Sequence, residues 1–237
     1  MLWAIKKFIG RYPLFHSTCA EETEYIRLSF GKDARIVQIP NFIEVPDEVE
    51  SSAGKYILLL GRIHWKKGID NLIRAVSMSE EFLRSEYVLK IAGKGASGYQ
   101  KDLQELVSEL KLEEKIIFVG QVEGEAKQKL LADAFWTIMP SHTENFGLVV
   151  LESLAQNTPV VASTGSPWEV LETEKLGFWR DNSPEELSRI LTRIVEMDAA
   201  EYEAHRKRGR KFVKENFDMS QNIERWTDAY RSLNPGD

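Results

Sequence analysis

The chain has 237 residues, of which 43% are hydrophobic and 29% charged, the balance of an ordinary soluble globular protein. Its formal net charge of −6 leaves no basic excess to neutralise nucleic-acid phosphates, which excludes a nucleic-acid-binding surface as its main function. The single cysteine, Cys19, excludes an internal disulfide and favours a reducing compartment, and no apolar run approaches the ~20 residues that span a bilayer.

The first residues, 1–15, mix Lys6, Lys7 and Arg11 with aromatic and aliphatic side chains. They lack the apolar core and the small-residue cleavage site of a signal peptide. An ordinary basic helix is the favoured interpretation, with a helix lying on a membrane surface as the alternative. We therefore expect a cytoplasmic protein and leave open a peripheral contact with the inner membrane.

The next segment resembles one strand–helix–strand unit, with strands over residues 14–18 and 35–39 and a helix over 21–30. Such a unit cannot bury a core alone. Residues 1–43 are therefore expected to be the remnant of an N-terminal domain whose beginning lies outside this chain. Residues 44–55 are acidic and lack periodicity, so they are predicted to be a linker.

From residue 56 onward, short apolar runs alternate with stretches in which apolar residues recur at helical spacing. Strict alternation predicts crossover units, and therefore an α/β fold with a Rossmann-like parallel sheet and helices on both faces over residues 56–216. Residues 217–237 should form a final helix. The predicted strands are 56–60, 87–92, 116–119, 135–139, 159–162 and 177–179. Apolar residues at helical spacing mark two helices, at 69–76 and at 103–110, and the other predicted helices are 125–133, 146–156, 184–197, 200–216 and 219–233.

Two cations follow the first strand of this predicted sheet, where ligands of parallel sheets bind. Gly61 ends the strand, and its small size permits a tight turn and close approach to a ligand. Arg62 and Lys67 would flank a diphosphate, since a guanidinium can bind two oxygens at once. A solvated basic turn before a helix is the alternative.

The glycines after the second strand fit a dinucleotide-binding spacing. Gly93, Gly95 and Gly98 satisfy G-x-G-x-x-G, but the next strand ends in Gly120 and Gln121, where the motif requires a ribose-binding acid. This absence disfavours an oxidoreductase.

The most specific pattern runs from Pro140 to Glu152, from a strand end into a helix. The first N–H groups of a helix have no intrahelical partner, and the helix dipole is positive there, so a diphosphate is a natural ligand. Gly147 would allow close approach, Glu144 would project over a sugar, and Glu152 would accept hydrogen bonds from a ribose diol. The alternative is that Glu144 favours the helix dipole and Glu152 lies on a solvated face.

These patterns together resemble glycosyltransferase family 4, the group 1 transferases of the GT-B fold, over about residue 14 to the C-terminus. The sequence G-R-I-H-W-K-K-G is similar to the family's G-R-x-x-x-x-K-G, and Glu144 and Glu152 match its E-x7-E motif. The turn of residues 164–169 resembles the loop that follows, and it either closes over the same pocket or is a plain connection.

The resemblance implies the C-terminal, donor-binding half of a retaining glycosyltransferase. Such enzymes transfer sugar from a nucleoside diphosphate sugar, such as a UDP-sugar, to a glycan or lipid-linked acceptor, here in bacterial polysaccharide or lipopolysaccharide synthesis. The resemblance implies no metal and no cofactor. It implies catalytic roles for Arg62, Lys67 and Glu144. It implies donor contacts from Gly61, Gly95, Gly120, Val122, Asn145, Phe146, Gly147, Leu148 and Glu152.

The resemblance also places the acceptor site mainly in the N-terminal domain, of which this chain holds little. Nucleotide binding with little or no transfer is therefore expected of the chain alone. Two alternatives stay open: a non-catalytic nucleotide-binding module that pairs with a separate N-terminal subunit, and a GT-B nucleotide-sugar epimerase. The base, the sugar and the acceptor are left undetermined.

Overall fold

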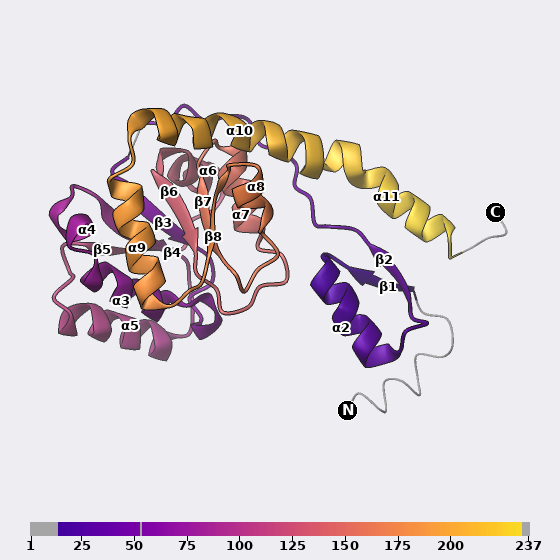
Figure 1. Cartoon of the computed structure of the whole chain (residues 1–237), viewed down its shortest axis with the longest axis horizontal. Helices are drawn as coiled ribbons and strands as arrows, with labels where there is room; N and C mark the ends of the chain where they lie inside the picture. Colours follow the sequence, from indigo (N-terminus) through magenta and orange to yellow (C-terminus); the bar gives the residue numbers. More distant parts are fainter. Residues whose placement is uncertain (1–13, 53, 234–237) are drawn as a thin grey trace.

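The computed structural model describes residues 14–52 and 54–233, and within this part the chain forms two units of unequal size (Figure 1). The expected basic helix at residues 1–15 falls mostly on residues 1–13, outside those described. The small unit consists of β1 (Leu14–Ser17), α2 (Ala20–Phe30) and β2 (Arg35–Gln38), with β1 and β2 parallel. It is the strand–helix–strand unit that the sequence predicts.

The large unit is a six-stranded parallel sheet in the order β5-β4-β3-β6-β7-β8. Its strands are β3 (Tyr56–Leu60), β4 (Val88–Ala92), β5 (Ile116–Gly120), β6 (Trp136–Met139), β7 (Val160–Ser163) and β8 (Gly177–Arg180). The chain builds the sheet outward from β3 in one direction and then from β6 in the other. The carboxyl ends of β3 and β6 therefore flank a topological switch point, where open α/β sheets bind their ligands.

Helices cover both faces of this sheet because the central strand is apolar on both sides. In β3, Ile57 and Leu59 belong to one buried cluster, and Tyr56 and Leu58 belong to another. The first cluster includes α3 (Ile69–Met78), α5 (Ser97–Glu109) and α9 (Pro184–Val195). On the opposite face lie α6 (Gly124–Asp133), α7 (Leu148–Ala155) and α10 (Ala199–Phe217). The predicted fold class is confirmed.

The element bounds differ from the prediction in a few places. Helix α7 begins at Leu148 rather than at residue 146, because Gly147 has a left-handed φ of 82° and ends the preceding loop. The sequence did not reveal η1 (Trp65–Lys67), α4 (Glu80–Arg84) and α8 (Val170–Thr173). Each spans about one turn, which is too short to show a helical period.

The segment between the units packs against the large one instead of running free. The backbone N–H of Val49 donates to the side-chain oxygen of Gln156 at 3.0 Å, and the Gln156 amide donates to the Asp47 carbonyl at 3.1 Å. The last helix, α11 (Met219–Arg231), extends from the large unit along the small one (Figure 1). There the rings of Trp226 and His16 lie 4.5 Å apart. No helix in residues 14–52 and 54–233 is long and apolar enough to cross a membrane.

A histidine lies inside the large unit. His205 of α10 is 8% exposed and packs against the rings of Trp136 and Phe178 at 5.3 and 5.5 Å. Its Nδ1 donates a hydrogen bond to the Lys175 carbonyl at 3.1 Å. Burial penalises the imidazolium and lowers the pKa of His205 below its ordinary 6.5.

The folded protein should therefore lose stability through His205 as the pH falls below about 6.5, because the unfolded histidine then binds a proton more readily than the folded one. Above that pH both states hold the residue neutral. In urea denaturation from pH 8 to pH 5, the wild type should lose more unfolding free energy than His205→Gln, which keeps a hydrogen-bond donor but does not titrate. An equal loss of unfolding free energy from pH 8 to pH 5 in the two proteins would contradict this expectation.

Candidate functional site

A cleft of about 650 Å³ opens at the carboxyl ends of the central strands, at the switch point of the sheet. Most of the residues predicted from the sequence line it. These are Gly61, Arg62, Lys67, Val122, Glu144, Asn145, Phe146, Gly147, Leu148 and Glu152. Two predicted residues, Gly95 and Gly120, do not line this cleft.

The loop after β3 is held close to the loop after β6. Gly68 has a left-handed φ of 59°, and a Cβ there would lie 2.2 Å from the Pro140 carbonyl oxygen. The N–H of His142 donates to the Lys66 carbonyl at 2.8 Å. Only glycine fits at this approach, and the contact brings the cationic loop against the segment that carries Glu144.

Lys67 and Glu144 form an ion pair across this junction. Their side chains are 23% and 20% exposed, so both are partly removed from water. The hydroxyl of Ser141 also donates to Glu144 at 3.3 Å. Arg62 is exposed and lines the same cleft. The structure thus joins two residues to which the sequence analysis assigned separate tasks, phosphate and sugar binding.

Gly147 is the last residue of the loop that follows β6, and it directly precedes α7. A Cβ at Gly147 would meet Met139 Sδ at 2.6 Å and Glu144 Cγ at 3.2 Å. No side chain caps α7, so its first N–H groups are available to an anion in the cleft.

Glu152 lies about one turn into α7 and pairs with Lys127 of α6, with Nζ 2.9 Å from Oε1. Both side chains are about one quarter exposed, at 24% and 27%. Sequence reasoning missed Lys127, because a lone lysine in a short helix has no distinguishing spacing. It also missed other lining residues, which are Asn41, Leu60, Gly93, Lys94, Glu123 and Val149.

The two remaining predicted glycines, Gly95 and Gly120, make backbone contacts between the loops that surround the cleft. Gly95 forms a parallel bridge with Ile63, and a Cβ there would lie 2.0 Å from the Ile63 carbonyl oxygen. Gly120 accepts a hydrogen bond from the Gly93 N–H at 2.7 Å. Both glycines therefore order the loops after β3, β4 and β5.

The turn after β7 also has a supporting position. The Gly165 carbonyl accepts from the Glu144 N–H at 2.8 Å, and the Trp168 indole donates to the Phe146 carbonyl. Trp168 is 2% exposed. The turn lies under the 144–147 loop and does not line the cleft.

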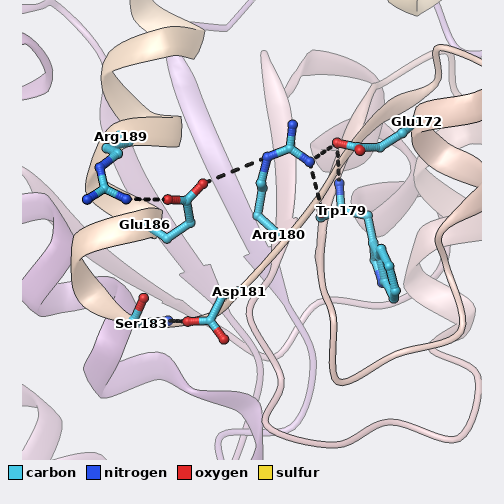
Figure 2. A network of polar contacts seen from close by, with 7 residues as sticks. All are labelled: Glu172, Trp179, Arg180, Asp181, Ser183, Glu186 and Arg189. Atoms are coloured by element: carbon cyan, nitrogen blue, oxygen red, sulfur yellow. Dashed lines mark hydrogen bonds and ion pairs between the residues drawn. The ribbon is translucent and has the colours of Figure 1, made fainter.

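A charged network lies at the end of β8 and orders the chain that follows this strand (Figure 2). Arg180 pairs with Glu172 and lies 3.8 Å from Glu186, and hydrogen bonds from Ser183 lower the pKa of Asp181. Next to it, the Asn182 amide donates to the Pro140 carbonyl at 2.9 Å. The network therefore supports the carbonyl that Gly68 contacts. No group of three or more His, Cys, Asp or Glu residues suited to a metal occurs in residues 14–52 and 54–233.

Known proteins resemble this chain in both sequence and structure. The family model described as "Glycosyl transferases group 1" matches residues 43–212. An uncharacterized glycosyltransferase of Methanocaldococcus jannaschii is 40% identical over 127 residues, covering 53% of this chain and 31% of that protein. A D-inositol 3-phosphate glycosyltransferase of a Nocardioides strain is 35% identical over 158 residues, covering 60% and 34%. The chain thus spans about a third of the length of these relatives.

Solved structures share the fold at low sequence identity. Sucrose-phosphate synthase from Thermosynechococcus elongatus aligns with a TM-score of 0.86 at 23% identity, over 100% of this chain and 62% of that one. HepE of Anabaena, solved in complex with UDP and glucose, aligns with a TM-score of 0.86 at 19% identity, over 98% and 66%. The family match extends over well more than half of the sequence and contains the whole cleft except Asn41. This chain belongs to the group 1 glycosyltransferases.

Proposed function

We propose that this chain binds the nucleoside diphosphate sugar of a retaining glycosyltransferase that acts on a glycan or lipid-linked acceptor in surface polysaccharide synthesis. One observation carries the proposal: two cations and an uncapped helix start line the same cleft at the switch point of the sheet. Both features favour a diphosphate. The complex of HepE with UDP and glucose supports the same class of donor.

In this proposal the diphosphate lies at the start of α7, between Arg62 and Lys67. A phosphate oxygen takes the place of the Glu144 carboxylate beside Lys67. Glu144 is then free to accept hydrogen bonds from hydroxyls of the transferred sugar, next to Asn145. Donor binding and orientation of Glu144 are therefore coupled through one lysine.

The ribose is proposed to bind at Glu152. Lys127 holds one carboxylate oxygen of Glu152, which fixes its orientation and leaves the second oxygen for a ribose hydroxyl. Val122, in the loop after β5, is proposed to face the base together with its backbone neighbours.

In the transfer step, the acceptor oxygen bonds to the anomeric carbon as the bond from that carbon to the diphosphate oxygen breaks. The electron pair stays on the departing diphosphate, and the acceptor proton passes to one of its oxygens. Arg62 and Lys67 would stabilise the charge that develops there. We propose retention of configuration and independence of metal ions, both testable with product NMR and with EDTA.

We further propose that residues 1–43 belong to an acceptor-side domain and that α11 connects it with the donor-side unit of residues 56–216. The ring contact of Trp226 with His16 supports this assignment. A cytoplasmic location with peripheral membrane contact completes the proposal.

The direct test is a thermal-shift screen of the purified chain with UDP, GDP, ADP and their sugars. A ligand at a hundredfold its Kd stabilises the folded state by about 2.7 kcal/mol, so one base should give a clear shift. No shift with any of them would overturn the proposed function. A product assay identifies an epimerase, which changes the sugar without an acceptor, and co-purification of a separate N-terminal subunit would favour the non-catalytic module.

Lys67→Met should weaken nucleoside diphosphate binding about tenfold or more, because one charge-assisted contact worth ~1.5–3 kcal/mol is lost and Glu144 then repels the phosphate. Lys66→Met is the matched control. Lys66 is exposed, lies over the Trp65 ring at 5.9 Å and does not line the cleft. Isothermal titration calorimetry compares the two variants. Equal affinities, or an equal loss for the free nucleoside, would contradict a phosphate-binding role.

Gly147→Ala should lower both the melting temperature and the nucleotide affinity. The left-handed backbone would strain an alanine by roughly 1–2 kcal/mol, and its Cβ would collide with the Met139 side chain. Gly98→Ala is the control, because Gly98 lies in α5 with open space around its Cβ position. It should leave the affinity unchanged and stability equal or slightly raised. Full nucleotide affinity in Gly147→Ala would show that the loop is not part of the site.

A further inference from the structure

A second cavity, of about 480 Å³, adjoins the donor cleft and shares Glu144 and Asn145 with it. It lies between the start of α2 in the small unit and the loops that follow β6 and β7 in the large one. Glu144 and Asn145 line both cavities, so a group bound in the second one would lie next to a sugar held at Glu144. The two cavities therefore have the relative position of a donor and an acceptor site.

The walls of this cavity are tied together by polar contacts between the units. The Thr18 hydroxyl donates to the Asn145 carbonyl at 3.4 Å, and the Asn145 amide donates to Glu22 Oε1 at 3.4 Å. These contacts hold the first turn of α2 against the loop that carries Glu144. The cavity is thus built from both units rather than from the surface of one.

The charge of its lining is one-sided. Three carboxylates, those of Glu21, Glu22 and Glu144, contribute to it, and no lysine or arginine of residues 14–52 and 54–233 lines it. Among the described residues of the lining, His142 is the one basic side chain. A phosphorylated group would enter among negative charges without a cationic partner.

The start of α2, which could attract an anion, carries the protein's own acids. Glu22 Oε2 accepts hydrogen bonds from the N–H and the hydroxyl of Thr18, at 2.7 and 2.8 Å. Glu21 lies in the same first turn, so two carboxylates offset the positive end of the α2 dipole. These two negative charges disfavour a phosphate at the start of α2, although no side chain caps its N–H groups.

The remaining features of the lining suit hydroxyl groups. Carboxylates accept hydrogen bonds from hydroxyls, and Thr143 and Thr164 add side chains that both donate and accept. Tyr25 is 70% exposed and presents an aromatic ring beside these polar groups. Such a ring can pack against the C–H face of a pyranose while its hydroxyl stays solvated.

We propose that this second cavity binds the acceptor as an uncharged, hydroxyl-bearing sugar and discriminates against phosphorylated acceptors. The proposal rests on the donor function above, because it takes Glu144 as the boundary between donor and acceptor. Glu21 is the residue that sets the discrimination. It is exposed and lines the cavity, whereas Glu22 is bound to Thr18 and Glu144 to Lys67.

The test uses the full chain saturated with the nucleoside diphosphate that stabilises it in the thermal-shift screen. The probes are the methyl α-glycosides of glucose, mannose and galactose, each with and without a 6-phosphate, titrated by ligand-observed NMR. At least one neutral glycoside should bind, and its 6-phosphate should bind at least tenfold more weakly. High salt should narrow this gap, since the repulsion is electrostatic.

Glu21→Lys should reduce the ratio of the affinities for each neutral glycoside and its 6-phosphate at least threefold. Glu24→Lys makes the same charge change on the same helix, but Glu24 pairs with Arg27 and does not line the cavity. It should leave the gap unchanged, which controls for net charge. Circular dichroism checks that both variants keep the fold.

Equal or tighter binding of the phosphates by the wild type would overturn the proposal, and so would binding of none of the six probes. An equal effect of Glu24→Lys and Glu21→Lys would also overturn it, because the selectivity would then reflect net charge rather than the cavity. The thermal shift with nucleotide is a separate readout. Its presence without glycoside binding sinks the acceptor proposal alone, and its absence sinks the donor function.

Discussion

The cleft depends on one close contact between two loop backbones, that of Gly68 with the Pro140 carbonyl. The parallel sheet brings the carboxyl ends of β3 and β6 side by side, but an ordinary side chain at residue 68 would force the following loops apart. With glycine there, the cation of Lys67 reaches the carboxylate of Glu144. The charge arrangement of the whole site follows from that backbone approach.

The surrounding structure supports this contact from several sides. Asn182 donates to the same Pro140 carbonyl, and the charged network around Arg180 orders the segment in which Asn182 lies (Figure 2). The buried Trp168 supports the next residues of the loop through Phe146. A site built on loops becomes rigid when each loop carbonyl has a partner from another element.

Two acid–base pairs divide the cleft. Lys67 with Glu144 lies toward the small unit, and Lys127 with Glu152 lies between α6 and α7. The charges within each pair nearly cancel. A ligand must therefore either displace the carboxylate from its lysine or bind to the carboxylate oxygen that the lysine leaves free. Glu144 differs from Glu152 because it also lines the second, acidic cavity. Its carboxylate therefore links the two cavities.

The sequence by itself determined the α/β class, the order of strands and helices and the residue types at the strand ends. These features follow from local periodicity and from glycine positions, which are properties of neighbouring residues. It also identified most of the cleft, including Arg62, Glu144 and Gly147, because motifs that follow successive parallel strands must meet at one edge of the sheet. The single-turn elements were missed because one turn shows no period.

Tertiary structure alone decided which charges are partners. Nothing in the spacing of Lys127 indicates that it pairs with Glu152, and the pairing of Lys67 with Glu144 spans 77 positions in the chain. The supporting positions of Gly95 and Trp168, and the cavity shared between α2 and the 142–145 loop, likewise depend on packing between distant segments. Pattern and propensity describe what a segment prefers, whereas side-chain pairing depends on how the crossovers place segments that are far apart in sequence.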